Sequence, residues 1–166
     1  DAEQRVERAH ELYERGQWQA ALDELKAAIA INPFNSSWYF NLGLTLEALE
    51  DFERASRTYK TLLELVRYEE TPEALRAWRL LAESYYRQGK YDQAVDELKA
   101  FLAKYPNHDV EGKIRLTLGR TLLARFDYEE GRTELRKVIE ERPTSEISRW
   151  ARYILSESYL DQSRSA

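Results

Sequence analysis

Two histidines and the many carboxylates are the side chains of this sequence that could hold a metal ion. Glu7 and His10 are three residues apart, a spacing that puts a carboxylate and an imidazole on one side of a helix. Helical di-iron sites need this pair twice, together with further carboxylates. The other histidine, His108, has no Glu three residues before it. We therefore expect no metal site.

Residue patterns for nucleophilic catalysis or nucleotide binding are also missing. The 166 residues include no Cys, and the sequence suggests no Ser and acid partner for either histidine. No glycine-rich phosphate loop occurs. The sequence therefore predicts a protein that is not an enzyme and that uses no cofactor.

The composition suits a helical protein with solvated outer faces. Hydrophobic residues make up 43% and charged residues 33%, and the formal net charge is -5. This mildly acidic balance argues against nucleic acid as a partner. No apolar run approaches the roughly 20 residues that span a bilayer, so we expect a soluble protein of the cytoplasm or periplasm without membrane insertion. Because the sequence has no Met, we expect a processed or excised product.

Apolar residues recur at helical spacing along almost the whole chain, and only six Gly and four Pro interrupt it. The pattern predicts a first pair of helices near 2–15 and 18–31. In the second pair the expected terminal Pro is replaced by Arg67, so we expect that helix to extend to about residue 67. Thr71-Pro72-Glu73 then predicts a helix start, with Thr as N-cap, Pro at the first position and an acid in the first turn.

The helical pattern repeats with a period of about 34 residues. In the segment 75–108, positions 4, 7, 8, 11, 15, 17, 20 and 32 are Trp78, Leu81, Ala82, Tyr85, Gly89, Tyr91, Ala94 and Pro106. Position 8 is small in every repeat (Ala9, Gly43, Ala82, Gly119), and so is position 20 (Ala21, Ala55, Ala94, Gly131). Small side chains at both positions let two helices approach closely. We predict one domain over residues 1–166, with repeats at approximately 2–35, 36–69, 75–108 and 112–145, and a last helix at 145–162.

This pattern resembles the tetratricopeptide repeat (TPR) family over residues 2–162. The resemblance implies an all-α fold, a right-handed TPR superhelix (an α-solenoid) of helix-turn-helix repeats that ends in a C-terminal capping helix. The first, or A, helix of each repeat would line a concave groove. Residues 79–160, with a 37-residue spacing, are similar to a bacterial subset that includes the Tol-Pal coordinator and the TPR lipoprotein of the barrel-assembly machine.

Members of this family usually bind a peptide or a partner helix through positions 2, 5, 6, 9, 12 and 13 of the A helices. Carried onto this chain, the resemblance implies twelve partner-binding residues: Phe40, Asn41, Leu44, Arg76, Arg79, Glu83, Tyr86, Arg87, Lys113, Arg120, Trp150 and Tyr153. Five of these are cations, which predicts a partner with an acidic segment or a free carboxylate. The alternative is that the arginines pair with Glu83 and other acids and form an ordinary solvated face.

One TPR class binds the C-terminal carboxylate of chaperone tails through five clamp residues. The matching positions here are Val6, His10, Asn41, Arg76 and Leu80. The family pattern has Lys, Asn, Asn, Lys and Arg, so only Asn41 and Arg76 fit it. We expect no chaperone-tail clamp.

The sequence thus predicts a non-enzymatic adaptor that binds a peptide or partner protein in its groove, in a bacterial envelope or another multiprotein assembly. One alternative is a self-associating scaffold, with Trp150 and Tyr153 in the contact between copies. A second is a binder of single-stranded nucleic acid, in which Arg, Tyr and Trp side chains would stack on bases, although the net charge argues against it. A third is an enzyme with an active site that this family does not usually carry.

Overall fold

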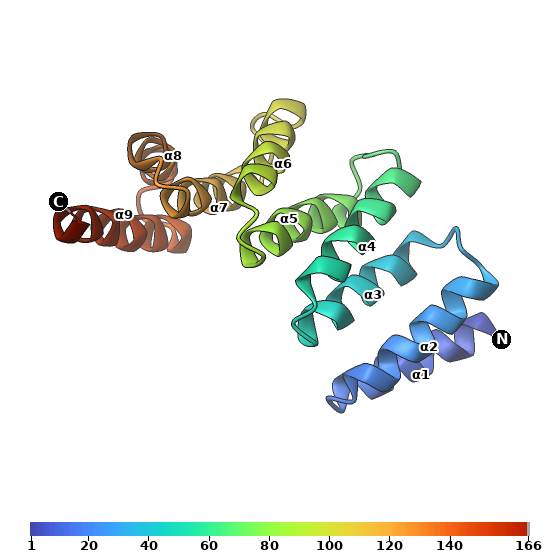
Figure 1. The fold of residues 1–166 in the computed structure, drawn as a ribbon. Helices are drawn as coiled ribbons and strands as arrows, with labels where there is room; N and C mark the ends of the chain where they lie inside the picture. The colour runs from blue at the N-terminus through green and yellow to red at the C-terminus, as the bar shows by residue number, and fades with distance from the viewer. Residues whose placement is uncertain (166) are drawn as a thin grey trace. The chain divides into compact units, whose positions relative to one another are not determined.

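The computed structural model describes residues 1–165, which form nine α-helices and no strand (Figure 1). The helices are α1 (Ala2–Glu14), α2 (Trp18–Ile31), α3 (Ser36–Ala48), α4 (Phe52–Leu65), α5 (Pro72–Arg87), α6 (Tyr91–Lys104), α7 (Glu111–Ala124), α8 (Tyr128–Glu141) and α9 (Glu146–Ser165). The predicted first pair of helices, near 2–15 and 18–31, agrees with α1 and α2. The all-α helical-repeat fold is confirmed.

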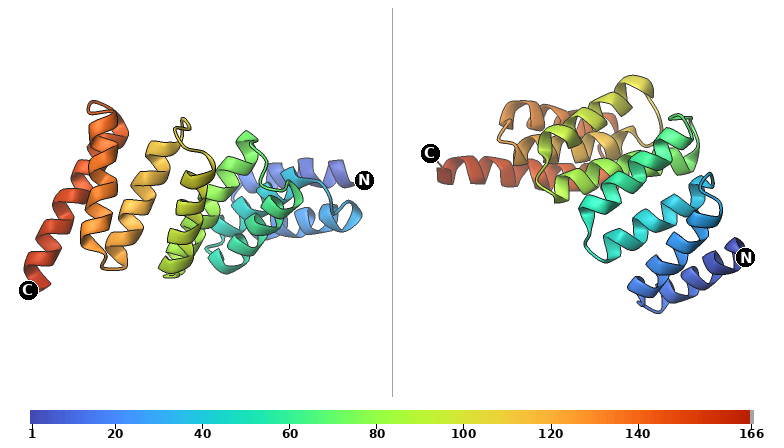
Figure 2. Two further views of the ribbon diagram at one scale, coloured as in Figure 1. Left: turned by 90° about the horizontal axis from the view of Figure 1, so that it is seen from above. Right: turned by 45° about the vertical axis from the view of Figure 1, so that its right-hand side comes forward.

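The chain divides into two compact units, here named unit 1 (Asp1–Gln88) and unit 2 (from Gly89 onward). In unit 1 each of the helices α1 to α4 packs on the helix that follows it, and α3 also contacts α5. In unit 2 the helices α6 to α9 pack in the same sequential way, and α7 also contacts α9. Figure 2 shows these antiparallel hairpins within each unit from two further directions.

Small residues let the two helices of a hairpin approach, as the repeat pattern predicts. In unit 1 a Cβ added to Gly43 of α3 would lie 2.6 Å from Cζ of Tyr59, a buried residue of α4. In unit 2 a Cβ on Gly131 of α8 would lie 2.9 Å from the carbonyl oxygen of Gly119 of α7. A side chain at either position would need the partner helix to move.

Tight turns reverse the chain after the A helices. The turns after α1, α3 and α7 each contain a residue in the left-handed region: Gly16 (φ 72°), Glu50 (φ 58°) and Phe126 (φ 70°). After α7, for example, the amide of Asp127 donates to the carbonyl of Leu122 at 2.9 Å. These are Schellman caps, which satisfy the last carbonyl groups of the helix.

The predicted extension of the fourth helix to about residue 67 is wrong. Helix α4 ends at Leu65 because Arg67 and Tyr68 both adopt left-handed backbone angles, φ 51° and 55°. The amide of Tyr68 donates to the Leu63 carbonyl at 2.9 Å and closes the same type of cap. The predicted start of α5 is confirmed, since the Thr71 hydroxyl accepts from the Ala74 amide at 3.1 Å.

Each unit has its own apolar core. The largest fully buried side chains are Leu22, Tyr59, Leu62, Leu63 and Leu81 in unit 1, and Val95, Leu98, Phe101, Ile114, Leu118, Leu122 and Leu135 in unit 2. Burial of each such side chain contributes about 1.5–3 kcal/mol. These cores hold the A helices α1, α3 and α5 of unit 1, and α7 and α9 of unit 2, in fixed positions.

Candidate binding surface

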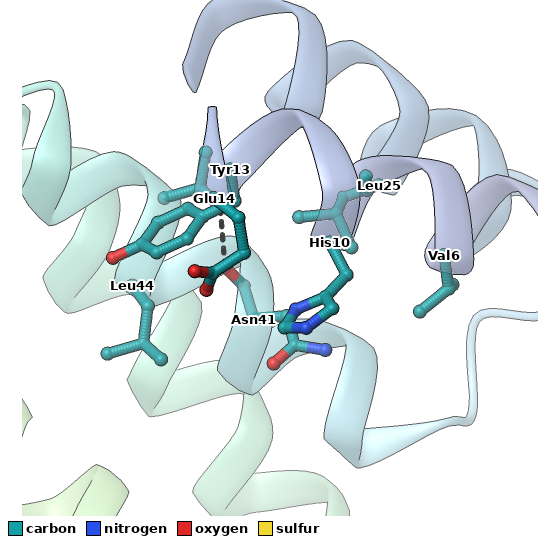
Figure 3. A pocket seen from close by; sticks show the side chains of 9 residues that line it. Val6, His10, Tyr13, Glu14, Leu25, Asn41 and Leu44 are labelled. Carbon is teal, nitrogen blue, oxygen red and sulfur yellow. Dashed lines mark hydrogen bonds between the residues drawn. The ribbon is translucent and has the colours of Figure 1, made fainter. Parts of the chain in front are cut away.

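A hollow of about 200 Å³ opens between α1 and α3 of unit 1. It is lined by Val6, Ala9, His10, Tyr13 and Glu14 of α1, by Leu25 of α2, and by Asn41, Leu44 and Thr45 of α3. Figure 3 shows the polar ends of His10, Glu14 and Asn41 gathered together, with Val6 on one side and Leu44 on the other. The structure thus brings the predicted contact residues Asn41 and Leu44 into one site.

Buried and exposed residues have separate roles in this hollow. Ala9 and Leu25 are buried, and the small side chain of Ala9 leaves the space above it open. Thr45 is buried as well, and its hydroxyl donates to the Asn41 carbonyl at 2.8 Å. His10 and Glu14 are exposed. The hollow therefore has a rigid apolar floor and a polar rim, which is the usual composition of a binding pocket.

Next to the hollow, predicted contact residues of α5 lie against aromatic rings of α3 and α4. The Arg76 guanidinium lies 4.8 Å from the centre of the Phe40 ring, and that of Arg87 lies 4.6 Å from the Phe52 ring. Phe40 itself is only 7% exposed, so it supports Arg76 from below and has little surface of its own for a partner. Cation–π contacts of this kind hold the arginines in place without neutralising them.

Glu47 of α3 is half-buried among side chains of α4 and α5. Burial raises the pKa of the Glu47 carboxyl above its ordinary value near 4.5, and the charge of Glu83 adds to this. The hydroxyls of Tyr59 and Ser84 and the charge of Arg79 act in the opposite direction without offsetting the burial. The Ser84 hydroxyl donates to Glu47 Oε1 at 3.3 Å. Glu83 and Tyr86 of α5 are also half-buried.

The remaining predicted contact residues belong to unit 2. Lys113 is exposed and Arg120 is half-buried, both on α7. On α9, Trp150 and Tyr153 are 55% and 58% exposed, and their rings meet edge to face with centres 6.2 Å apart. Together with Glu146 and Arg149 they line a wide, open hollow of about 430 Å³. Unit 2 therefore offers a second candidate contact area of a more aromatic kind.

Two features were not predicted from the sequence. Tyr13 and Glu14 line the hollow at positions 12 and 13 of the first repeat, so the repeat register could have identified them. Arg132 of α8 is buried at position 21, where Leu22 and Val95 stand in other repeats, and nothing in the sequence indicated this. Its guanidinium donates to the Ser158 hydroxyl at 3.0 Å and to the Ser158 carbonyl at 2.8 Å.

Within residues 1–165, no group of three or more His, Asp or Glu side chains is arranged to hold a metal ion. None of the helices described above combines the length and the apolar character needed to cross a membrane.

Three family models match parts of the sequence. Residues 9–50 match a model described as a TPR repeat, and residues 43–109 match one described as a tetratricopeptide repeat. Residues 81–166, just over half of the chain, match the model of the YfiO family, described as an outer membrane lipoprotein. No curated protein matches the sequence significantly.

Solved structures agree with these matches. A tetratricopeptide repeat protein from Parabacteroides merdae has a TM-score of 0.77 at 20% identity, over 96% of this chain and 60% of that one. MamA from Desulfovibrio magneticus has a TM-score of 0.73 at 18% identity, over 99% and 97% of the two chains. YrrB, a TPR protein with an unusual peptide-binding site, has a TM-score of 0.72 at 16% identity, over 98% and 78%.

At these identities the structural likeness establishes the fold alone, and this fold is typical of non-enzymatic scaffolds for protein interactions. With the three sequence matches and the repeated hairpins, it establishes that the chain belongs to the tetratricopeptide repeat family, and that its residues 81–166 carry the repeats of the outer membrane lipoprotein family.

Proposed function

We propose that this protein is a non-enzymatic scaffold that binds an extended peptide segment of a partner protein on the A helices of unit 1. The observation that carries the proposal is the hollow between α1 and α3, with its apolar floor and its rim of His10, Glu14 and Asn41. YrrB, one of the similar structures, is described as having a peptide-binding site, which supports the same type of ligand. The match of residues 81–166 to an outer membrane lipoprotein family supports a role in a bacterial envelope assembly.

The size of the hollow favours a peptide over a small molecule. At about 200 Å³ it is smaller than the roughly 300–1,000 Å³ of typical small-molecule sites, but it can receive one side chain. The rest of the peptide would continue along α3 and α5, where Arg76, Arg79, Tyr86 and Arg87 provide further contacts. Because packed helices hold these side chains before binding, little conformational entropy is lost on association.

Filling the hollow tests this proposal. Peptides are selected from a random twelve-residue phage library on the wild-type chain, and their affinities are then measured on Leu44→Trp, which places an indole in the hollow. Ile31→Trp is the matched control, because Ile31 is an exposed apolar residue of the same unit outside the hollow. We expect at least about tenfold weaker binding to Leu44→Trp, or about 1.4 kcal/mol, and no change for the control. Equal affinity for both variants would exclude the hollow as the site.

A second candidate function is self-association through α9, for which the observation is the exposed pair Trp150 and Tyr153. In this case the surface of α7 and α9, including Lys113 and Arg120, would contact another copy of the chain or a second partner. Light scattering tests it: a molar mass that rises from 19.6 kDa toward twice that value with concentration, and falls back in Trp150→Glu, would support self-association. A molar mass that stays at the monomer value at every concentration would exclude self-association, and the exposed surface of α9 would then be a candidate contact area for a different protein.

A further inference from the structure

We infer that the peptide bound by unit 1 has divided charge, with a basic side chain in the hollow at α1 and acidic side chains on the arginines of α5. This inference rests on the function proposed above and specifies the ligand of the same surface. It differs from the sequence-based expectation of a purely acidic segment. The evidence is a separation of unpaired charges between two helices of one compact unit.

Helix α1 carries unpaired negative charge on the side that contains the hollow. Glu3, Glu7 and Glu14 follow one another at intervals of four and seven residues, together with His10, so they lie on one helical face. All three carboxylates are exposed, and none forms an ion pair with another part of the chain that the structure describes.

The cations of α1 are engaged elsewhere. Arg5 and Arg8 pair with Glu24 of α2 at 2.8 and 3.7 Å, and Arg15 pairs with Glu11 at 4.0 Å. They therefore do not neutralise the face that carries Glu7 and Glu14.

Helix α5 carries the opposite charge. Arg76, Arg79 and Arg87 share one helical face, and none of them forms an ion pair within residues 1–165. Arg79 acts on the half-buried Glu47 only through its charge. Arg76 and Arg87 are stacked on the rings of Phe40 and Phe52. A guanidinium stacked on a ring keeps the N–H groups at its edge available, and these match the geometry of a carboxylate.

Acidic residues are present near α5, but they do not form ion pairs with the arginines. Glu47 of α3 is half-buried and accepts a hydrogen bond from the Ser84 hydroxyl. Glu83 of α5 is also half-buried and already interacts with another residue of the chain. The positive charge of α5 is thus open to a partner.

A ligand of one charge sign fits only part of this surface. A purely acidic peptide would meet Glu7 and Glu14 at α1, and a purely basic one would meet the arginines of α5, so each would include repulsive contacts. A Lys or Arg side chain in the hollow would pack its aliphatic part on Val6 and Leu44 and donate charge-assisted hydrogen bonds to Glu14. Its neighbours in the peptide could then supply carboxylates to Arg76 and Arg79.

The helix spacing sets the separation of the two charges in the peptide. Neighbouring packed helices lie about 8–10 Å apart, so two steps from α1 through α3 to α5 span at least roughly 20 Å. An extended chain covers about 3.3 Å per residue. The basic and acidic residues of the ligand should therefore be at least about six positions apart, in either order along the peptide.

The charge pattern of selected peptides tests the inference. Random twelve-residue peptides on phage are selected in parallel on four forms of the full chain: wild type, Glu7→Lys/Glu14→Lys, Arg76→Glu/Arg79→Glu and the control Glu64→Lys. Glu64 is exposed on α4, outside this surface, so its variant changes the net charge alone. Circular dichroism checks that each form keeps its helices.

We expect wild type and control to enrich peptides with a basic and an acidic residue at least about six positions apart. The α1 variant should enrich acidic peptides and the α5 variant basic ones, and each should bind the wild-type peptides at least about tenfold more weakly. Enriched peptides that carry charges of one sign, or no charge, would overturn the inference of divided charge. If such peptides still bind Leu44→Trp more weakly than wild type, the proposed function stands. Failure to enrich any peptide on any form would overturn both.

Discussion

In unit 1 one face of α1, with Glu3, Glu7 and Glu14, forms no ion pair within the described residues, whereas in unit 2 a network of charged side chains joins α7 to α8. Arg115 of α7 lies between Glu111 and Glu134, with N–O distances of 2.6 and 2.7 Å, and Lys137 pairs with Glu134 at 2.7 Å. The same residue types therefore join helices in one place and stay exposed without an ion pair in another. How many charged residues each unit contains does not show which of them join helices and which stay exposed. Their burial and their ion-pair partners do show it.

Arg132 gives the clearest example of the structural use. It is only 2% exposed, it donates twice to Ser158 of α9, and its guanidinium lies 3.9 Å from the centre of the Tyr159 ring. Arg76 of unit 1 also lies on an aromatic ring, but it is exposed. The contact of α8 with α9 depends on a buried cation that has no counterpart in the contacts of unit 1.

The largest effect should come from Arg132→Ala. Loss of the charged hydrogen bonds to Ser158 and of the contact with Tyr159 should lower the free energy of unfolding by about 3 kcal/mol. The matched change Arg76→Ala should cost less than about 1 kcal/mol, because Arg76 is exposed and has no ion pair. Urea denaturation followed by circular dichroism measures both. Similar losses in the two variants would contradict the distinction between the units.

The second largest expected loss of stability concerns the close approach of α3 and α4 in unit 1. In Gly43→Ala the new methyl group would overlap the buried Tyr59 ring, so the variant should lose about 2 kcal/mol of stability. Gly112→Ala in unit 2 is the control, since its nearest neighbour would be Ile147 Cδ1 at 3.8 Å. There the change should add about 0.5–1 kcal/mol through helix propensity alone. A neutral Gly43→Ala would show that α3 and α4 can separate at little cost.

The repeat pattern predicted much of the fold because its signals are local. The bounds of α1 and α2 follow from apolar spacing and from a glycine in the turn, and the start of α5 follows from Thr71-Pro72. The end of α4 was missed because Arg67 and Tyr68 are not residue types that indicate left-handed backbone angles. Their conformation depends on the hydrogen bonds of the cap, which the composition does not reveal.

The candidate surface was predicted less completely than the fold. The repeat register identified Asn41 and Leu44, which line the hollow, but it also selected Phe40, which is buried beneath Arg76. Whether an arginine stays exposed or holds a neighbouring helix depends on the side chains around it, as the exposed Arg76 and the buried Arg132 demonstrate. A single sequence without its neighbours in space cannot supply that information.

A smaller, pH-dependent effect should have opposite signs in the two units. In unit 2 burial opposes ionisation of Glu134, but hydrogen bonds and charges of Lys137 and Arg115 outweigh it and lower the pKa of this carboxyl. Its contribution to stability is therefore present above about pH 4.5 and is lost as the pH falls through its folded-state pKa. Glu47 in unit 1 has a raised pKa, so its contribution is present at low pH and is lost as the pH rises through that pKa.

Glutamine substitutions measure this difference. At pH 7 we expect Glu134→Gln to be less stable than wild type and Glu47→Gln to be more stable, each by at most about 1 kcal/mol. Both differences should shrink when unfolding is measured near pH 4. A Glu47→Gln variant that loses stability at pH 7 would show that the ionised carboxylate is well compensated by Ser84 and Arg79.

The smallest expected change in stability concerns the turns that follow α3 in unit 1 and α7 in unit 2. Glu50 in unit 1 and Phe126 in unit 2 adopt the left-handed backbone angles that glycine adopts at Gly16. Replacing Glu50 with Gly should therefore raise the free energy of unfolding by about 0.5 kcal/mol, because the strain it relieves exceeds the chain entropy that Gly loses on folding.

Phe126→Gly should gain less stability than Glu50→Gly if the aromatic ring of Phe126 contributes to the stability of unit 2. The ring is 75% exposed, and its centre lies 6.3 Å from that of Tyr128. A gain equal to that of Glu50→Gly, measured by thermal denaturation, would mean that the ring adds nothing to the stability of unit 2. An exposed phenylalanine kept in a strained conformation without a stabilising contact would then weaken the contrast between the units, because unit 2 would also hold a side chain ready for a partner. A loss of stability would instead assign Phe126, like Arg132, to the internal cohesion of unit 2.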